Sequence, residues 1–258
     1  MKKRIISAIV ACAIFIPLVI IGKIPFLIGL IGLSILAFRE LLTQYERNGP
    51  LPLFIKLLSY LSVVTLAVCE DSLIPAIGLI FLFVFISLIF IDKDEYNIDN
   101  ALHLFGSIVF VGFIFYIFNY IRVSSLDEFI YIFLVAVLTD TFAYFGGMLF
   151  GKHKLIPKIS PNKTIEGALI GLAFGTMFPT VYYIYMISPG SSFMIVMLIS
   201  LVLSIVGQLG DLIFSSMKRY YKIKDFSKIM PGHGGVLDRL DSVSFIGLTY
   251  VIIRMLFL

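Results

Sequence analysis

Residues 131–150 read YIFLVAVLTDTFAYFGGMLF, and this run of twenty residues contains one charged side chain, Asp140. A helix needs about 20 apolar residues to cross the roughly 30 Å hydrocarbon core of a membrane. An acid inside such a run is costly and usually functional. The stretch therefore predicts a membrane-spanning helix. Asp140 is either a functional acid or a buried acid held by a neighbouring helix or a cation.

The same apolar character extends along the whole chain of 258 residues. Sixty per cent of the residues are hydrophobic and 14% are charged, whereas about 45–50% are apolar in an ordinary soluble domain. A soluble domain of this size could not bury so much apolar surface. The sequence predicts an all-α, polytopic integral membrane protein. About nine transmembrane helices are expected, at residues 5–22, 25–38, 53–69, 73–91, 101–121, 128–150, 165–187, 192–216 and 242–258.

Lysine and arginine are distributed unevenly between the two sides of this predicted topology. Seventeen of these cations fall on one side and two on the other, with Arg254 inside the last span. Cytoplasmic loops carry such an excess, so the N-terminus is predicted to be cytoplasmic. The polar loops 151–164 and 217–241 then face the cytoplasm, where nucleotides are found.

Segment 25–38 is short, and either forms a tight hairpin with the first span or inserts only partly.

The loop 217–241 combines acids, glycines and cations. Asp238 and Asp241 are three residues apart and share a helix face, where they repel each other unless a cation lies between them. The glycines of PGHGG, 231–235, leave backbone N–H groups free to wrap an anion. Carboxylates, free amides and cations together fit a phosphate bound to a Mg²⁺-like ion. The cations just upstream are Lys218, Arg219, Lys222, Lys224 and Lys228.

Two further features lie close to these loops. Asp211 sits in an apolar run about two helical turns before Lys218, and an acid there is again a functional candidate. In KISPNKTIEG, 158–167, Thr164 can cap the following helix, whose N-terminus attracts anions. This second cluster is either a phosphate site or a capped helix start with a headgroup-binding lysine, Lys163.

The polar residues of the C-terminal half follow a known pattern. Ser-x-apolar-Lys-Arg stands at 215–219, Lys-Asp at 224–225, and Pro-x-His-Gly-Gly-apolar-x-Asp-Arg-apolar-Asp at 231–241. This pattern resembles the signature of the phosphatidate cytidylyltransferases, or CDP-diacylglycerol synthases. Met230 is a conservative departure, where the family usually has Leu, Ile or Phe. The resemblance extends to DTFAYFGG, SPNKTIEG and GDLIFSSMKR, while the first 120 residues match only in being helical and apolar.

The resemblance implies that CTP and phosphatidate react to give CDP-diacylglycerol and pyrophosphate, in phospholipid biosynthesis. It implies Mg²⁺ as the cofactor, with a second metal ion left open. The expected location is the bacterial inner (plasma) membrane, among membrane lipids, with the active site facing the cytoplasm. A homodimer is expected from the family, and no nucleic-acid partner. Residues 1–121 then supply N-terminal transmembrane helices and 122–258 the catalytic part.

The resemblance also assigns roles to particular residues. His233 either binds phosphate, donates a proton or holds the loop, and Asp140 is a supporting acid. The candidate metal ligands are Asp211, Asp238 and Asp241. The candidate catalytic residues are these three aspartates and His233. The candidate substrate-binding residues are Ser160, Lys163, Thr164, Lys218, Arg219, Lys224, Asp225, Gly234, Gly235 and Arg239.

Two other functions remain open from the sequence. A related enzyme could use another lipid, as an archaeal ether-lipid cytidylyltransferase or a polyprenol kinase does, because the lipid backbone is not readable from these residues. A transporter could use Asp140 and Asp211 as coupling sites, but it would show an internal repeat, whereas the polar loops here are confined to 151–241.

Overall fold

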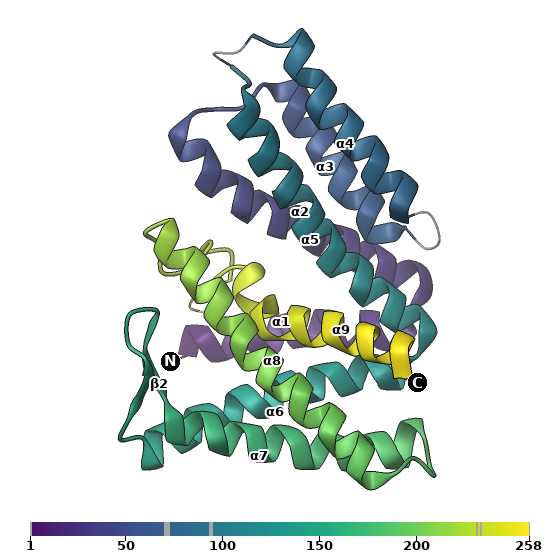
Figure 1. The fold of residues 1–258 in the computed structure, drawn as a ribbon, viewed down its shortest axis with the longest axis vertical. Coiled ribbons are helices and arrows are strands. Elements are labelled where there is room, and N and C mark those ends of the chain that lie inside the picture. The colour runs from purple at the N-terminus through teal and green to yellow at the C-terminus, as the bar shows by residue number, and fades with distance from the viewer. Residues whose placement is uncertain (1, 70–72, 93–94, 231, 233, 258) are drawn as a thin grey trace. The chain divides into compact units, whose positions relative to one another are not determined.

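The computed structural model describes residues 2–69, 73–92, 95–230, 232 and 234–257, and they are almost entirely helical (Figure 1). Each predicted apolar segment corresponds to one helix, as the all-α prediction requires. The polar segment 151–164 adds a small antiparallel hairpin of β1 (Lys154–Ile156) and β2 (Ser160–Thr164). The α-helices of the described residues are α1 (Lys2–Ile21), α2 (Lys23–Tyr45), α3 (Leu53–Val68), α4 (Leu73–Phe90), α5 (Ile98–Ser124), α6 (Leu126–Phe150), α7 (Ile165–Tyr182), α8 (Phe193–Tyr220) and α9 (Leu237–Phe257).

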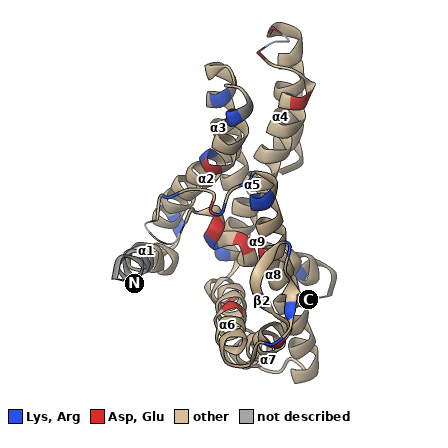
Figure 2. Cartoon of the chain, turned by 90° about the vertical axis from the view of Figure 1, so that its left-hand side faces the viewer, with Lys and Arg blue, Asp and Glu red and all other residues tan. Residues whose placement is uncertain are grey.

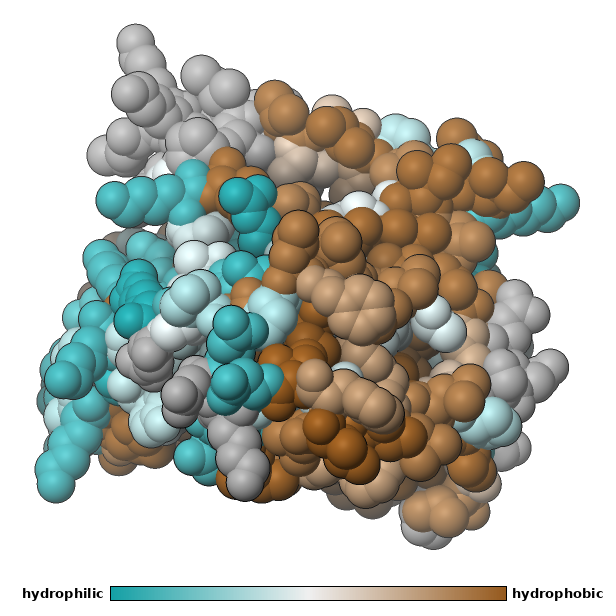
Figure 3. Space-filling model, turned by 90° about the horizontal axis from the view of Figure 1, so that it is seen from above, coloured by the Kyte–Doolittle hydropathy of each residue, from teal (hydrophilic) through white to brown (hydrophobic). Residues whose placement is uncertain are grey.

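Six helices within the described ranges are long and apolar enough to cross a membrane. They are α2, α4, α5, α6, α7 with the π-helical turn η2 (Tyr183–Ile187), and α8. Most of the helical surface carries no charge (Figure 2), and hydrophobic residues cover much of the surface seen in Figure 3. Exposed side chains such as Ile74 and Phe90 of α4 fit contact with lipid. The length and composition of these helices therefore identify an integral membrane protein. The number of nine spans and the cytoplasmic N-terminus stay predictions.

The second helix is longer than the apolar segment 25–38 predicts. It has 23 residues, because the helix continues through polar residues such as Glu40, which is buried. The chain passes from α1 to α2 at Gly22, whose φ of 68° favours glycine. Leu18 of α1 lies against Gly29 of α2, so the chain turns back on itself, as in the hairpin alternative.

The chain folds as two compact units. The first consists of Met1–Val123 and Asp225–Leu237, and the second of Ser124–Lys224 and Asp238–Leu258. The first unit therefore contains α1 to α4, all but the last residue of α5, and residues 225–236 of the loop between α8 and α9, the glycine-rich loop. The second contains α6, the β-hairpin, α7, α8 and all but the first residue of α9.

In the first unit, α2 packs against α3, with Phe38 and Ile55 fully buried. Arg122 in the last turn of α5 donates hydrogen bonds to the carbonyl oxygens of Val19 and Ile20, at 2.7 and 3.2 Å. These carbonyls lie at the C-terminal end of α1, where a cation is favourable. Arg122 therefore fastens the end of α1 to α5.

In the second unit, α6 and α7 pack more extensively than any other pair of described helices. A β-carbon at Gly171 of α7 would lie 2.7 Å from the Thr139 carbonyl oxygen of α6, and one at Gly167 would lie 2.5 Å from that of Ala143. Glycines four residues apart let the two backbones approach closely, as in membrane helix pairs. Thr139 also hydrogen-bonds Ser204 of α8 at 2.7 Å, which joins the third helix to this pair.

Candidate active site

A pocket of about 510 Å³ lies within the second unit. It brings together residues of α6, β2, α8 and α9 that are up to 101 positions apart in the sequence, from Asp140 to Asp241. Its polar lining combines cations, which can bind an anion such as phosphate, with carboxylates, which can bind a cation. The charged residues that line it are Asp140, Lys163, Asp211, Asp238, Arg239 and Asp241.

Lys163 of β2 and Asp211 of α8 form one ion pair of this pocket. The Lys163 Nζ and Asp211 Oδ2 atoms are 2.5 Å apart, and each side chain is about one quarter exposed, at 27% and 24%. Asp211 also accepts a hydrogen bond from the Ser215 hydroxyl at 3.4 Å. Both side chains of this pair therefore remain partly accessible from the pocket that they line.

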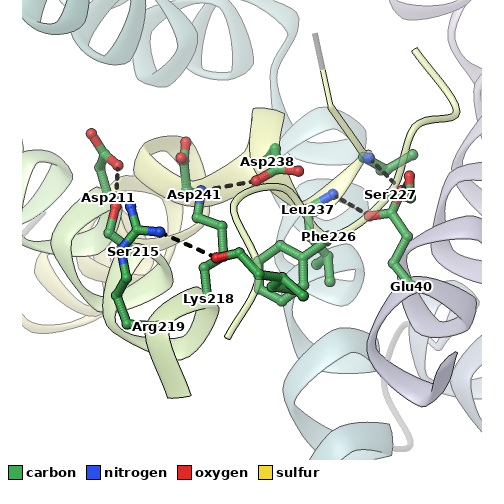
Figure 4. Close-up of polar contacts among 12 residues, drawn as sticks. Glu40, Asp211, Ser215, Lys218, Arg219, Phe226, Ser227, Leu237, Asp238 and Asp241 are labelled. Atoms are coloured by element: carbon green, nitrogen blue, oxygen red, sulfur yellow. Dashed lines mark hydrogen bonds and ion pairs between the residues drawn. The ribbon is translucent and has the colours of Figure 1, made fainter. Parts of the chain in front are cut away.

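Lys218 and Asp238 form a second, more buried ion pair (Figure 4). The Lys218 Nζ and Asp238 Oδ1 atoms are 2.8 Å apart, and the side chains are 12% and 3% exposed. Lys218 lies in the last turn of α8 and Asp238 in the first turn of α9, and both charges suit the helix end at which they lie. The pair joins the two helices in which the signature begins and ends.

Asp140 and Asp241 complete the acidic lining. Asp140 accepts a hydrogen bond from the Ser242 hydroxyl at 3.0 Å, so the intramembrane acid has a partner on a neighbouring helix. Asp241 precedes the predicted ninth span, and burial raises the pKa of its carboxyl, with further increases from the negative charges of Asp211 and Asp140 and an opposing effect of Lys218. Crowded carboxylates of this kind favour a cation in their midst.

The predicted metal ligands do not form a ready-made site. Among the described residues, no group of three or more His, Cys, Asp or Glu side chains is close enough to hold an ion. Their carboxylate oxygens nevertheless suit Mg²⁺, which usually takes one or two protein carboxylates and fills its other positions with water and phosphate. The residues therefore fit a metal ion that arrives with a phosphate-bearing substrate.

The β-hairpin is held in place at the start of α7. Thr164 is the N-cap of this helix and accepts a hydrogen bond from the Gly167 amide at 3.2 Å, which confirms the predicted cap. Glu166 accepts hydrogen bonds from the Lys152 and His153 amides, at 3.0 and 3.2 Å. Thr164 also lines the pocket, so the cap and the hairpin together place Lys163.

The remaining predicted residues lie elsewhere. Arg219 donates hydrogen bonds to the Ile159 and Ile223 carbonyl oxygens, at 3.3 and 3.2 Å, so it links the end of α8 to the hairpin. Ser160 lies in β2 and is half-buried, and Lys224 is exposed. His233 lies outside the described residues. The predicted residues that belong to the first unit are Asp225, Gly234 and Gly235.

Two amide side chains of the pocket lining were not among the residues predicted from the sequence. Asn162 stands inside the SPNKT turn, and Gln208 stands in the apolar helix α8. Gln208 donates a hydrogen bond from Nε2 to the Ala168 carbonyl oxygen at 3.1 Å. A polar amide within an apolar helix, three residues before Asp211, was the signal that could have indicated it.

The helices and the pocket define a class of protein: a polytopic membrane protein with a mixed acidic and basic site. A family model described as the cytidylyltransferase family matches residues 2–257. The chain belongs to this family, which confirms the resemblance drawn from the signature at 215–241.

Curated relatives resemble the chain over nearly its whole length. The phosphatidate cytidylyltransferase of Staphylococcus haemolyticus (strain JCSC1435) is 36% identical, over 95% of this chain and 96% of its own length. The proteins of the same name from Staphylococcus epidermidis (strain ATCC 35984) and Staphylococcus aureus (strain COL) are 36% and 35% identical, over the same shares.

Proposed function

We propose that this protein is a phosphatidate cytidylyltransferase, which converts CTP and phosphatidate to CDP-diacylglycerol and pyrophosphate. Its membership of the cytidylyltransferase family and the names of its relatives support this activity. The observation that carries the proposal is the pocket that joins the predicted acids Asp211, Asp238 and Asp241 to Lys163 and Arg239. These residues suit two anionic substrates that must meet.

The reaction requires neutralised and aligned phosphates rather than a strong base. A phosphate oxygen of phosphatidate, already ionised at neutral pH, attacks the α-phosphorus of CTP. A new P–O bond forms while the bond to the bridging oxygen breaks, and pyrophosphate leaves with that oxygen. Lys163 and Arg239 bind phosphate oxygens and reduce the repulsion between the substrates. Lys218 holds the Asp238 carboxylate by their ion pair.

We propose Mg²⁺ as the cofactor, held by Asp211 and Asp238 with Asp241 as a third candidate. When bound, the metal ion would offset the charge of the triphosphate and of the pyrophosphate that leaves. Asp211 is the more accessible ligand, because its side chain is 24% exposed and its lysine partner can turn to a phosphate. Asp238 is held in place by Lys218, so its direction is set before substrates arrive.

The proposed location is the plasma membrane of a bacterium, with the pocket on the cytoplasmic side. The lysine and arginine bias between predicted loops supports this orientation, and the cytoplasm is where CTP is found. Phosphatidate would reach the same pocket from the bilayer. The predicted homodimer stays an expectation from the family.

A coupled assay tests the activity. The purified protein, in detergent with phosphatidate, CTP and Mg²⁺, should release pyrophosphate, and omission of any one of the three should stop the release. Pyrophosphate release without lipid, or equal release when a polyprenol replaces phosphatidate, would contradict the proposal.

A further inference from the structure

The first unit holds the glycine-rich loop through a buried acid, Glu40 of α2, which is 2% exposed. One carboxylate oxygen accepts hydrogen bonds from the Ser227 hydroxyl at 2.6 Å and the Val236 amide at 2.8 Å. The other oxygen accepts one from the Leu237 amide at 2.9 Å. Glu40 thus contacts both ends of the loop, and Figure 4 shows its side chain directed at them.

A second residue of α2 makes the same connection one turn later. The Gln44 amide donates a hydrogen bond from Nε2 to the Phe226 carbonyl oxygen at 2.9 Å, and the bond is buried. Residues four apart lie on the same helix face. One face of α2 therefore carries two polar side chains, Glu40 and Gln44, that both form hydrogen bonds with the loop.

The contact with Glu40 explains why residue 235 is a glycine. A β-carbon at this position would lie 2.5 Å from the carboxyl carbon of Glu40, closer than side-chain atoms approach each other. Gly235 is not among the residues with positive φ, so room for Glu40, rather than backbone conformation, explains the glycine. The resemblance predicts a different role for Gly235, in substrate binding.

The Val236 and Leu237 amides stand at the start of α9, where a helix leaves N–H groups without partners in its own backbone. An anion is favourable at such a position, and Glu40 supplies it from within the chain. Burial of a carboxylate is costly unless donors surround it, so the donors and the acid depend on each other. The position where α9 begins is thereby fixed.

We propose that Glu40 is a positioning residue for the cytidylyl transfer, assisted by Gln44. It fixes the first turn of α9, where Asp238 follows Leu237 directly in the same helix. This inference rests on the proposed function for its kinetic effect. It gives the N-terminal half of the chain, which the signature does not reach, a defined part in the reaction.

The test compares Glu40→Gln with a matched control, Glu46→Gln. Glutamine keeps the size of Glu40 but places an N–H group where the Leu237 amide needs an acceptor. Glu46 is a nearby acid that pairs with Lys56 at 2.6 Å. Glu40→Gln should lower kcat about 30-fold per folded molecule, since small misplacements of reacting groups are this costly, with KM for CTP changed less than about threefold. Glu46→Gln should match the original chain.

Limited proteolysis gives a readout that needs no activity. Trypsin can cut after Lys228, an exposed residue of the loop. Cleavage there in the folded, detergent-solubilised chain should be about tenfold faster in Glu40→Gln than in Glu46→Gln, because local opening exposes the site.

A pair of compensating variants tests the contact itself. Gly235→Ala should lose activity, because its β-carbon meets the carboxylate. Glu40→Asp withdraws that carboxylate by one methylene. The double variant Glu40→Asp/Gly235→Ala should therefore be several-fold more active than Gly235→Ala alone. Such coupling between two substitutions is expected when the two residues are in contact.

The outcomes separate the inference from the proposed function. If the original chain makes no CDP-diacylglycerol, the proposed function fails, and the proteolysis result still tests whether Glu40 holds the glycine-rich loop. If the original chain is active and Glu40→Gln equals Glu46→Gln in kcat and in cleavage at Lys228, Glu40 does not position the loop and the inference is wrong.

Discussion

Replacement of Asp238 with asparagine should lower both turnover and stability, because Asp238 is a proposed metal ligand and also the partner of Lys218 in a buried ion pair. Asparagine keeps the size of Asp238 and one oxygen, but it removes the charge that would hold the metal ion. Asp211→Asn makes the same chemical change at the Lys163 pair. Both variants should lose about a thousandfold in turnover, since charge stabilisation of this kind amounts to several kcal/mol and about 4 kcal/mol corresponds to a thousandfold.

The two variants should differ in stability. The Lys218 and Asp238 side chains are 12% and 3% exposed, and removal of one partner from a buried pair costs about 3–5 kcal/mol. The Lys163 and Asp211 side chains are 27% and 24% exposed, and solvent reduces the contribution of such a pair to about 1 kcal/mol or less. Thermal unfolding in detergent should show a clear loss for Asp238→Asn and a small one for Asp211→Asn.

A double variant isolates the cause of the turnover defect. Lys218→Met together with Asp238→Asn removes the charge left without its partner, so the stability should recover while turnover stays low. Higher Mg²⁺ should relieve a partial defect if metal binding is what was lost. Asp127→Asn is the control, because asparagine can still accept the hydrogen bond that the Tyr182 hydroxyl gives Asp127 at 3.1 Å. If turnover recovers in step with stability in the double variant, Asp238 has only a structural role and the reasoning is refuted.

Two further predictions concern topology and helix packing. Single cysteines can be placed in a chain without its native cysteines. Lys154→Cys and Lys228→Cys should react with an impermeant thiol reagent only from the cytoplasmic side, and Ser191→Cys only from outside. Reversed labelling would overturn the predicted orientation. Gly171→Val should lower the free energy of unfolding by about 1–3 kcal/mol, since its side chain meets the α6 backbone. In the control Gly78→Ala the new methyl group enters open space, so this variant should unfold as the original chain does. Equal unfolding of the two variants would contradict the observed packing of α6 against α7.

The positions of the helices could be predicted because apolar length is a local property of the sequence. The second helix shows the limit of this reasoning. Its predicted end at residue 38 follows the loss of apolar residues, but α2 continues to Tyr45. Glu40 is polar and yet buried, because its partners lie on a distant loop. No local pattern distinguishes such an acid from an exposed one.

The candidate site was predictable in its members but not in its pairs. Sequence position predicted that Asp211 lies near Asp238 and Arg239, and all three line the pocket. Which lysine faces which acid depends on tertiary packing, so the pairing of Lys163 with Asp211 had no signal in the sequence. The Glu40–Val236 hydrogen bond joins residues 196 positions apart, and a chain read by spacing alone does not indicate it.

The transfer of the α-phosphate of CTP to lipid tests the central claim most directly. The purified protein is given phosphatidate, Mg²⁺ and CTP labelled at either the α- or the γ-phosphate, and the lipid is extracted and counted. If the protein is a phosphatidate cytidylyltransferase, the α-label enters the lipid in equal amount to the pyrophosphate released, while the γ-label stays in the aqueous phase. Entry of the γ-label into lipid, or no entry of the α-label, would contradict it.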